Sequence, residues 1–224
     1  MDPNIDLNRN LVNCNFEGMD LSLAKLAGAD MSGANLNSVN LSGADLAGAD
    51  LTGAKLVIAN LDGANLTGAN LTGAELAEAN LNSVNLSDAD LTGARPMGAT
   101  LTNADLTGAN LTGANLNTAN LDGANLTNAN LTNATLTNVT LDGANLTNAD
   151  MSGANLGGAD LIAADLSGAN LHDSSLTGAN LTGANLTNAN LTNANLTGAN
   201  LAFANLDGAN LTAANLDGVV NYTR

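Results

Sequence analysis

The chain has 224 residues, 24 of them glycine, and a formal net charge of −16 from 21 acidic and 5 basic side chains. This balance excludes direct binding to a nucleic-acid backbone or an anionic membrane, because both require basic patches on the protein. One cysteine and one histidine exclude a disulfide framework and a zinc site, which need several such side chains together. We therefore expect no cofactor and no metal, and an unidentified protein as the partner.

Residues 1–10 precede the first repeat and carry the apolar side chains Ile5 and Leu7. They lack a charged segment followed by an apolar one, so they do not resemble a secretory signal. We expect this leader to fold as an N-terminal cap over the first repeats, helped by Leu23, since the end of a repeat array needs a cover.

Residues 11–220 repeat in one register of five, most regularly over residues 176–200, and form 42 units. With the leucine position named i, leucine occupies it in 38 units, and the exceptions are Phe16, Met31, Pro96 and Met151. Position i−2 is alanine in 35 units, position i−1 is usually Asn or Asp, and position i+2 holds 23 of the 24 glycines. The unbroken register predicts a single domain.

A period of five fits neither a helix nor a straight strand. Successive leucines would be displaced by roughly 140° on an α-helix and would alternate between the two faces of a strand. In a short extended segment, residues i−2 and i share one side and point inward, while i−1 points outward. Glycine, Asn and Ser at i+2 tolerate positive φ, so the chain is expected to bend there in every unit.

This pattern, with Ala at i−2, Asn or Asp at i−1 and Leu at i, resembles the pentapeptide-repeat family, in the Leu-rich type abundant in cyanobacteria. The resemblance implies an all-β fold, a right-handed quadrilateral parallel β-helix with four units per coil. It would give about 10 coils and a rod of about 50 Å, at the roughly 4.8 Å spacing of stacked strands.

A 20-residue coil makes further predictions about columns of side chains. Lys25 would lie beside Asp45, and Lys55, Glu75 and Arg95 would form one column of alternating charge. Each opposite pair would contribute about 0.2–1 kcal/mol. A hydroxyl column would also run along the rod through Thr52, Thr72, Thr92, Thr112 and Thr132.

Five outward side chains are the predicted interaction surface. Asp30, Asp50 and Asp90 share one column of the coil, where a solvated acidic face is the simpler interpretation and a weak cation site the other. Ile162 and Phe203 are apolar residues at outward positions, two coils apart on one wall. Together they could form a contact surface for a protein.

Two irregularities interrupt or end the repeat. Pro96 takes an inward leucine position and has no N–H, which predicts a local kink or a small void. Residues 221–224 form a C-terminal tail that is too short for a capping helix. An end-to-end homodimer, in which a second copy covers the last coil, is therefore one expectation.

The sequence predicts that the protein is not an enzyme. His172 is an outward residue beside Asp173, and Cys14 is an inward residue about eight coils away, so they cannot combine in a nucleophilic site. No GxxxxGK[ST] phosphate-binding loop occurs among the many glycines.

A non-catalytic scaffold for protein interactions is the leading prediction. The alternative comes from the resemblance: Qnr and MfpA-like members of the family imitate duplex DNA and bind DNA gyrase. Here the charge amounts to about one per 3 Å of rod against one per about 1.7 Å of duplex, and Phe16 is the one phenylalanine at position i. Ice binding through the threonine column is a remote third hypothesis.

A cytoplasmic location is expected. Many triplets such as Asn65-Leu66-Thr67 match the N-glycosylation acceptor and would be modified on a eukaryotic secretory route. Polar residues recur in every unit, which argues against a membrane span.

Overall fold

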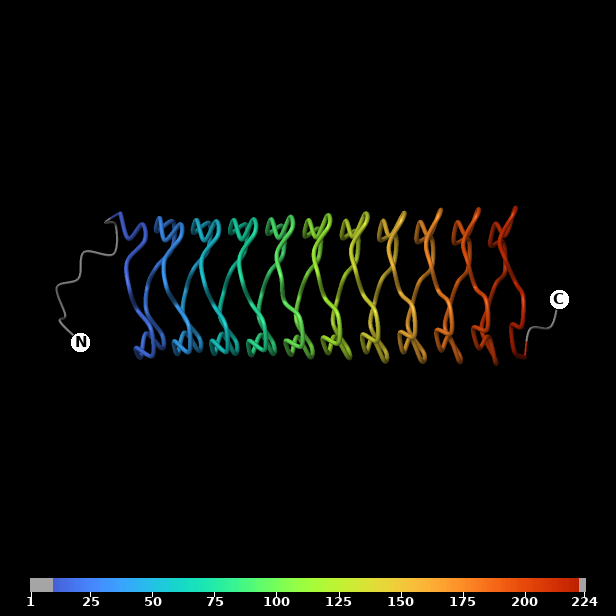
Figure 1. Ribbon diagram of the computed structural model, residues 1–224, viewed down its shortest axis with the longest axis horizontal. Helices are drawn as coiled ribbons and strands as arrows, with labels where there is room; N and C mark the ends of the chain where they lie inside the picture. Colours follow the sequence, from blue (N-terminus) through green and yellow to red (C-terminus); the bar gives the residue numbers. More distant parts are fainter. Residues whose placement is uncertain (1–9, 222–224) are drawn as a thin grey trace.

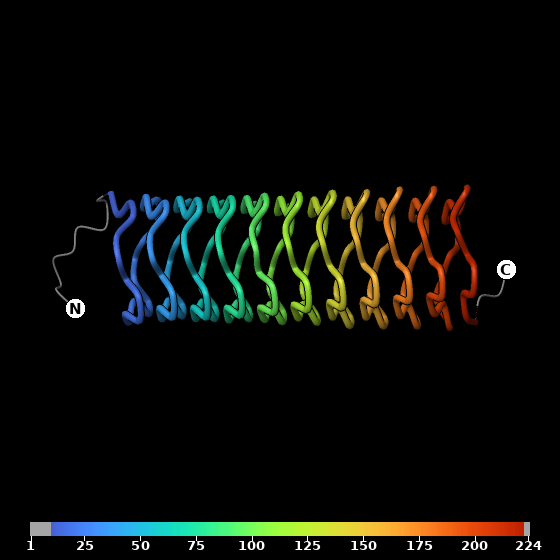
Figure 2. Tube along the Cα trace, in the orientation of Figure 1, coloured from blue at the N-terminus to red at the C-terminus, as the bar shows by residue number. Residues whose placement is uncertain are grey.

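The computed structural model describes residues 10–221 as one straight rod, with the first and the last described coil at opposite ends (Figures 1 and 2). It is a right-handed quadrilateral β-helix, as predicted. Parallel bridges join residues 20 apart, beginning with Asn15 and Asn35 and ending with Asn200 and Val220. Each bridge is one residue long, and residues 10–221 contain no α-helix and no longer strand. The leader, except for Asn10, and residues 222–224 of the tail lie outside the described part, so the predicted cap is not described.

Away from Pro96 and from the first and last described coils, each five-residue unit forms the same four backbone hydrogen bonds, as the unit at Leu46 illustrates. The N–H groups of Leu46 and Gly48 donate to the following coil, to Asn65 at 2.7 Å and to Thr67 at 2.9 Å. The Asp45 N–H donates to the preceding coil, and the Ala49 N–H donates to the Leu46 carbonyl at 2.9 Å and closes a turn. Backbone hydrogen bonds therefore connect each inner coil to the coil before it and to the coil after it.

The turn needs a positive φ at position i+2, as the sequence predicts. Gly48 has a φ of 63°, and the same conformation is adopted where the residue is not glycine, as at Ile58 with 58°. A turn closed from i+3 to i with positive φ only at its second central residue is a type II turn. Glycine dominates this position because it enters the left-handed region without steric cost.

The core is a continuous stack of leucine and alanine side chains. Between Leu26 and Leu201 the apolar side chains at positions i and i−2 are buried, and most are 0% or 1% exposed. Ser174 replaces an inward alanine, and its hydroxyl donates to the Leu171 carbonyl at 2.7 Å. Toward the ends several of these positions are only half-buried, including the free thiol of Cys14.

Pro96 removes one bridge without bending the rod. Its side chain is buried in the leucine stack, but it has no N–H to donate to the next coil, and the bridge between Arg95 and Asn115 is missing from the series. The neighbouring bond from Leu76 to the Arg95 carbonyl is 3.2 Å, against 2.7 Å at Leu66. The coils keep an even spacing through this point (Figure 2). Of the two alternatives predicted for Pro96 the kink is therefore wrong, and the small void stays a prediction.

Candidate functional site

The side chain at position i−1 completes the hydrogen bonding of each unit. In the unit at Leu51, Asp50 Oδ1 accepts from the Thr52 N–H at 2.9 Å and from the Thr52 hydroxyl. The i+1 amide is the one N–H that the backbone ladder leaves over, so Asn or Asp at i−1 provides its acceptor. Asparagine also donates along the column, as Asn60 does to Asn40 at 3.1 Å. The side chain at position i−1 thus has a structural role, because it folds back and hydrogen-bonds to the backbone of its own wall.

Four units that lack Asn or Asp at i−1 take the acceptor from the preceding coil. Asn82 Oδ1, at position i+1 of its own unit, accepts from the Thr102 N–H at 3.0 Å, where residue 100 is threonine. Three further amides take their acceptor from the preceding coil in the same way. The N–H groups of Val57, Thr137 and Asp142 donate to the side-chain Oδ1 atoms of Asn37, Asn117 and Asp122, respectively. Every Asn at an i+1 position in this chain is used in this way.

Neither device operates in four described units, whose i−1 residues are Lys25, Glu75, Arg95 and Ser175. Two of these units, those that begin after Glu75 and Arg95, lie one coil apart. Position i−1 is Glu75 in one and Arg95 in the other, and the residues one coil earlier, Val57 and Ala77, have no side-chain acceptor. Within residues 10–221 the amides of Ala77 and Met97 find no hydrogen-bond acceptor. The two free N–H groups of Ala77 and Met97 therefore lie one coil apart on the same wall of the rod.

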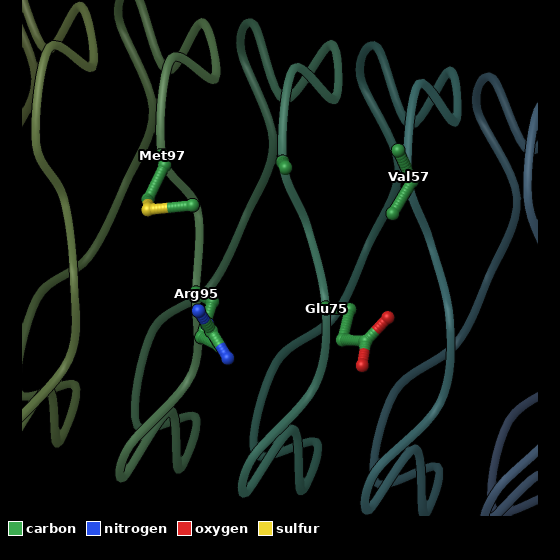
Figure 3. Close-up of a pocket in the computed structure, with 5 residues that line it drawn as sticks. Val57, Glu75, Arg95 and Met97 are labelled. Carbon is green, nitrogen blue, oxygen red and sulfur yellow. The ribbon is translucent and has the colours of Figure 1, made fainter.

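The wall is hollowed at this point. The hollow has a volume of about 260 Å³ and is lined by Val57, Glu75, Ala77, Arg95 and Met97, which we call the Glu75–Arg95 hollow (Figure 3). Ile58, next to Val57 in the sequence, is 58% exposed. The Met97 sulfur accepts from the Asn115 amide at 3.1 Å, which holds that side chain at one side.

The charged side chains around the hollow do not pair with one another. In the described part of the chain, contact between a basic and an acidic side chain is confined to His172 and Asp173, 3.0 Å apart. In Figure 3 the Glu75 carboxylate points away from Arg95. The predicted columns are confirmed, since Lys55, Glu75 and Arg95 bridge in order, but the predicted ion pairs are wrong. Exposed, flexible side chains gain little from a pair that water screens.

The predicted surface residues lie on other parts of the rod. Asp30 bridges Asp50, and Asp90 lies further along the same column, but each of the three accepts a turn N–H at 2.9–3.1 Å. Ile162 is half-buried, whereas Phe203 is 93% exposed with a φ of 59°. The structure does not bring these two groups together, and their role in binding stays a prediction.

The chain matches the family model described as pentapeptide repeats, in 8 copies that span residues 8–42, 20–57, 59–95, 119–158, 154–193 and 194–220. The chain belongs to the pentapeptide-repeat family.

Solved structures of other pentapeptide-repeat proteins resemble this one. HetL from the cyanobacterium Nostoc sp. PCC 7120, described as involved in regulation of heterocyst differentiation, is 37% identical with a TM-score of 0.60, over 95% of this chain and 91% of that chain. Rfr23 from Cyanothece 51142 is 42% identical over 45% of this chain and 63% of that chain, with a TM-score of 0.25. QnrB1, a plasmid-mediated fluoroquinolone resistance protein, is 18% identical over 93% and 90%, with a TM-score of 0.33. A search of curated protein sequences finds no match.

The histidine and the threonines that the sequence singled out in this pentapeptide-repeat protein contact neighbouring groups of the rod itself. His172 Nδ1 lies 3.1 Å from the Thr192 carbonyl, and Nε2 lies 3.0 Å from Asp173. Threonine hydroxyls of the predicted column, such as that of Thr72, donate to the Asn or Asp two residues earlier. The described residues include no group of three His, Cys, Asp or Glu that could hold a metal ion, and no helix that could cross a membrane.

Proposed function

We propose that this protein is a non-catalytic scaffold that holds a protein partner on the wall carrying the Glu75–Arg95 hollow. The observation that carries the proposal is the coincidence, at one place on a regular rod, of an apolar hollow, two unpaired charged side chains and two free amides. Within the described residues the i+1 amides of Ala27 and Thr177 also lack an acceptor, but in the adjacent described coils the matching amides of Ala47, Gly157 and Thr197 are satisfied by Asp or Asn side chains. The similarity to HetL gives a precedent for a regulatory role.

Several features support a non-catalytic and cytoplasmic role. Cys14 and His172 lie about eight coils apart along the rod, and the leucine stack fills the interior. The chain keeps Asn-Leu-Thr triplets along its length, which agrees with a protein that never meets the eukaryotic glycosylation machinery.

The test uses variants that restore the regular wall. In Glu75→Asn/Arg95→Asn both i−1 positions receive the usual residue of the repeat, so folding should be preserved. The control, Lys25→Asn/Asp165→Asn, also removes one positive and one negative charge, but from another column. Immobilised wild-type and control proteins should retain a partner from a lysate of the source cells that the hollow variant loses. Equal retention by all three proteins would reject this wall as the binding surface.

A second candidate function is imitation of duplex DNA toward DNA gyrase, and the net charge of −16 favours it. The acidic side chains, however, are spread over all four columns of i−1 positions, for example Asp20, Asp30, Asp45 and Glu75. A duplex instead presents its charge in two continuous rows. The scaffold is therefore the preferred proposal.

End-to-end pairing of two copies is compatible with either function. The apolar side chains of the last coil, Leu206, Leu211 and Leu216, are only half-buried, and a second copy would cover them. Sedimentation velocity over a hundredfold range of concentration should detect the dimer, and a constant monomer mass would reject it.

A further inference from the structure

We propose that the Glu75–Arg95 hollow binds a carboxylate that lies next to an apolar side chain of the partner protein, with the amides of Ala77 and Met97 as donors. The proposal rests on the proposed scaffold function for the identity of the partner as a protein. Recognition of the chemical group itself can be measured without that partner.

The regular units of the rod show to which acceptor the i+1 amides donate. In regular units the acceptor is the Oδ1 of Asn or Asp, as in the bonds from the Thr92 amide to the Asp90 carboxylate at 2.9 Å and from the Ser167 amide to Asp165 at 3.0 Å. At Ala77 and Met97 this acceptor is missing. An incoming carboxylate would occupy the position that an Asp of the chain fills elsewhere. Because the two amides are one rung apart, about 4.8 Å, its two oxygens could serve both.

The hollow presents donors rather than acceptors. The carbonyls of Ala77 and Met97 already accept from the Ile58 amide at 3.0 Å and from the Glu78 amide at 2.9 Å. The guanidinium of Arg95 adds further donors and a positive charge, and it has no acidic partner in the described part of the chain. Such a surface selects an anionic, acceptor-rich group.

The apolar residues that line the hollow favour an apolar side chain next to the carboxylate of the partner. Val57 and Met97 both line the hollow, and Met97 is polarizable and adapts to different apolar shapes. The Glu75 carboxylate points away from Arg95 and leaves the guanidinium free (Figure 3). A terminal or side-chain carboxylate beside a leucine-like side chain combines these requirements.

The first experiment follows the Met97 amide directly by NMR. The chain has five methionines, so protein labelled with ¹⁵N-methionine gives a simple spectrum in which the variant Met97→Leu assigns the Met97 signal. N-acetyl-leucine is titrated as the probe and N-acetyl-leucinamide as its uncharged match. We expect a saturable downfield shift of the Met97 signal with the acid only, while the signals of the buried Met31 and Met151 stay in place. No shift, or equal shifts with acid and amide, would overturn the proposal.

The second experiment separates the free amides from simple charge attraction. Glu75→Asn and Glu75→Gln each remove one negative charge, but only Asn has the length that places its oxygen on the Ala77 amide. We expect Glu75→Asn to weaken binding of N-acetyl-leucine about tenfold, which is the loss of one charged hydrogen bond, and Glu75→Gln to retain or strengthen it. Equal strengthening by both variants would contradict the role of the amide.

The two proposals fail in different ways. If N-acetyl-leucine does not bind but a partner is retained by the wild-type wall and lost by Glu75→Asn/Arg95→Asn, the carboxylate inference is wrong and the scaffold stands. If the probe binds as expected but that variant retains every partner, the hollow recognises carboxylates and the proposed scaffold surface is wrong.

Discussion

The side chain at position i−1 determines how each unit of this rod closes. Four of the five amides in a unit are satisfied by backbone carbonyls, and the fifth is satisfied by an Asn or Asp oxygen, as in the bond from Ser87 to Asn85 at 3.0 Å. Burying or half-burying an amide without an acceptor costs free energy. The abundance of asparagine therefore reflects the backbone, and positions without it are the informative ones.

The conformation at i+2 makes Ile58 a strained residue. A β-branched side chain with a φ of 58° lies in the left-handed region at a cost of about 1–2 kcal/mol. We expect Ile58→Asn to raise the free energy of unfolding by about 1 kcal/mol, measured by urea unfolding. Ile162→Asn is the matched control, because Ile162 lies at i+1 and has no positive φ. An equal gain from the control would show that exposure of isoleucine, and not its backbone, is responsible.

Asp20 should titrate below the ordinary range of an aspartate. The backbone N–H of Ser22, then the Ser22 hydroxyl and the Asn40 amide lower the pKa of this carboxyl from 3.8, by favouring its charged form. A lowered folded pKa means that the stabilisation is present at neutral pH and is lost as the pH falls through the folded pKa. NMR titration of the carboxyl carbon should give this low midpoint, and Ser22→Ala should raise it. A midpoint that Ser22→Ala leaves unchanged would exclude the hydroxyl as a cause.

At the scale of the coil, adjacent units share their acceptors. Asn82 lies at i+1 and serves the Thr102 amide one coil later, because Thr100 cannot do so. The hydrogen bond that Asn82 accepts thus depends on the identity of Thr100, which lies 18 positions further along the chain. This is coupling between coils, and it can be measured as a pairwise term.

A double-mutant cycle tests this coupling. We expect Asn82→Ala to lower the free energy of unfolding by about 1 kcal/mol, the net value of one hydrogen bond. In the background Thr100→Asn, which restores the usual acceptor for Thr102, the same change should cost little. Chemical denaturation of the four proteins gives the coupling energy, and additive costs would show that Asn82 does not serve the Thr102 amide.

Truncating a leucine of the stack should lower the free energy of unfolding most in the middle of the rod. Leu116 is 0% exposed, whereas Leu216 in the last coil is half-buried. Leu116→Ala leaves a cavity between rigid coils and should cost about 2–5 kcal/mol, and Leu216→Ala should cost clearly less. Urea unfolding followed by circular dichroism measures both. Equal costs would indicate that the last coil is covered in solution.

Most of the fold follows from the sequence, because period and turn chemistry leave one solution. Leucine at i, alanine at i−2 and glycine at i+2 predicted the buried and bent positions. The 20-residue coil came from the resemblance to pentapeptide repeats, and the column that it predicts for Lys55, Glu75 and Arg95 is observed. The role of i−1 was not predicted, since alternation says only that a side chain leaves the core and not that it curls back. The hollow was missed because it arises from two missing acceptors 20 residues apart. Asn37, Asn82 and Asn117 at i+1 were the signal that could have revealed the acceptor rule.

At the scale of the whole molecule, the distribution of charge is the basis for preferring the proposed scaffold over the imitation of DNA. Asp30, Asp50, Asp90 and Asp150 share one column, but neutral residues such as Asn70 and Asn110 interrupt it. Other acidic residues lie at turn positions of different walls, such as Asp62 and Asp88. The acidic side chains are therefore spread around the rod and do not form the paired rows that a DNA-binding groove reads.

A supercoiling assay tests this at the whole-molecule scale. We expect that the protein, titrated to micromolar levels at low and moderate salt, leaves the activity of DNA gyrase unchanged, because a diffuse negative rod offers no ordered rows to the enzyme. A short duplex oligonucleotide provides the control for competition at the DNA site. Inhibition that weakens as salt rises would contradict the prediction, because salt-sensitive competition is the signature of phosphate-like charges. The variant Asp30→Asn/Asp50→Asn/Asp90→Asn would then identify the source, since it removes charge from one column and keeps every turn acceptor.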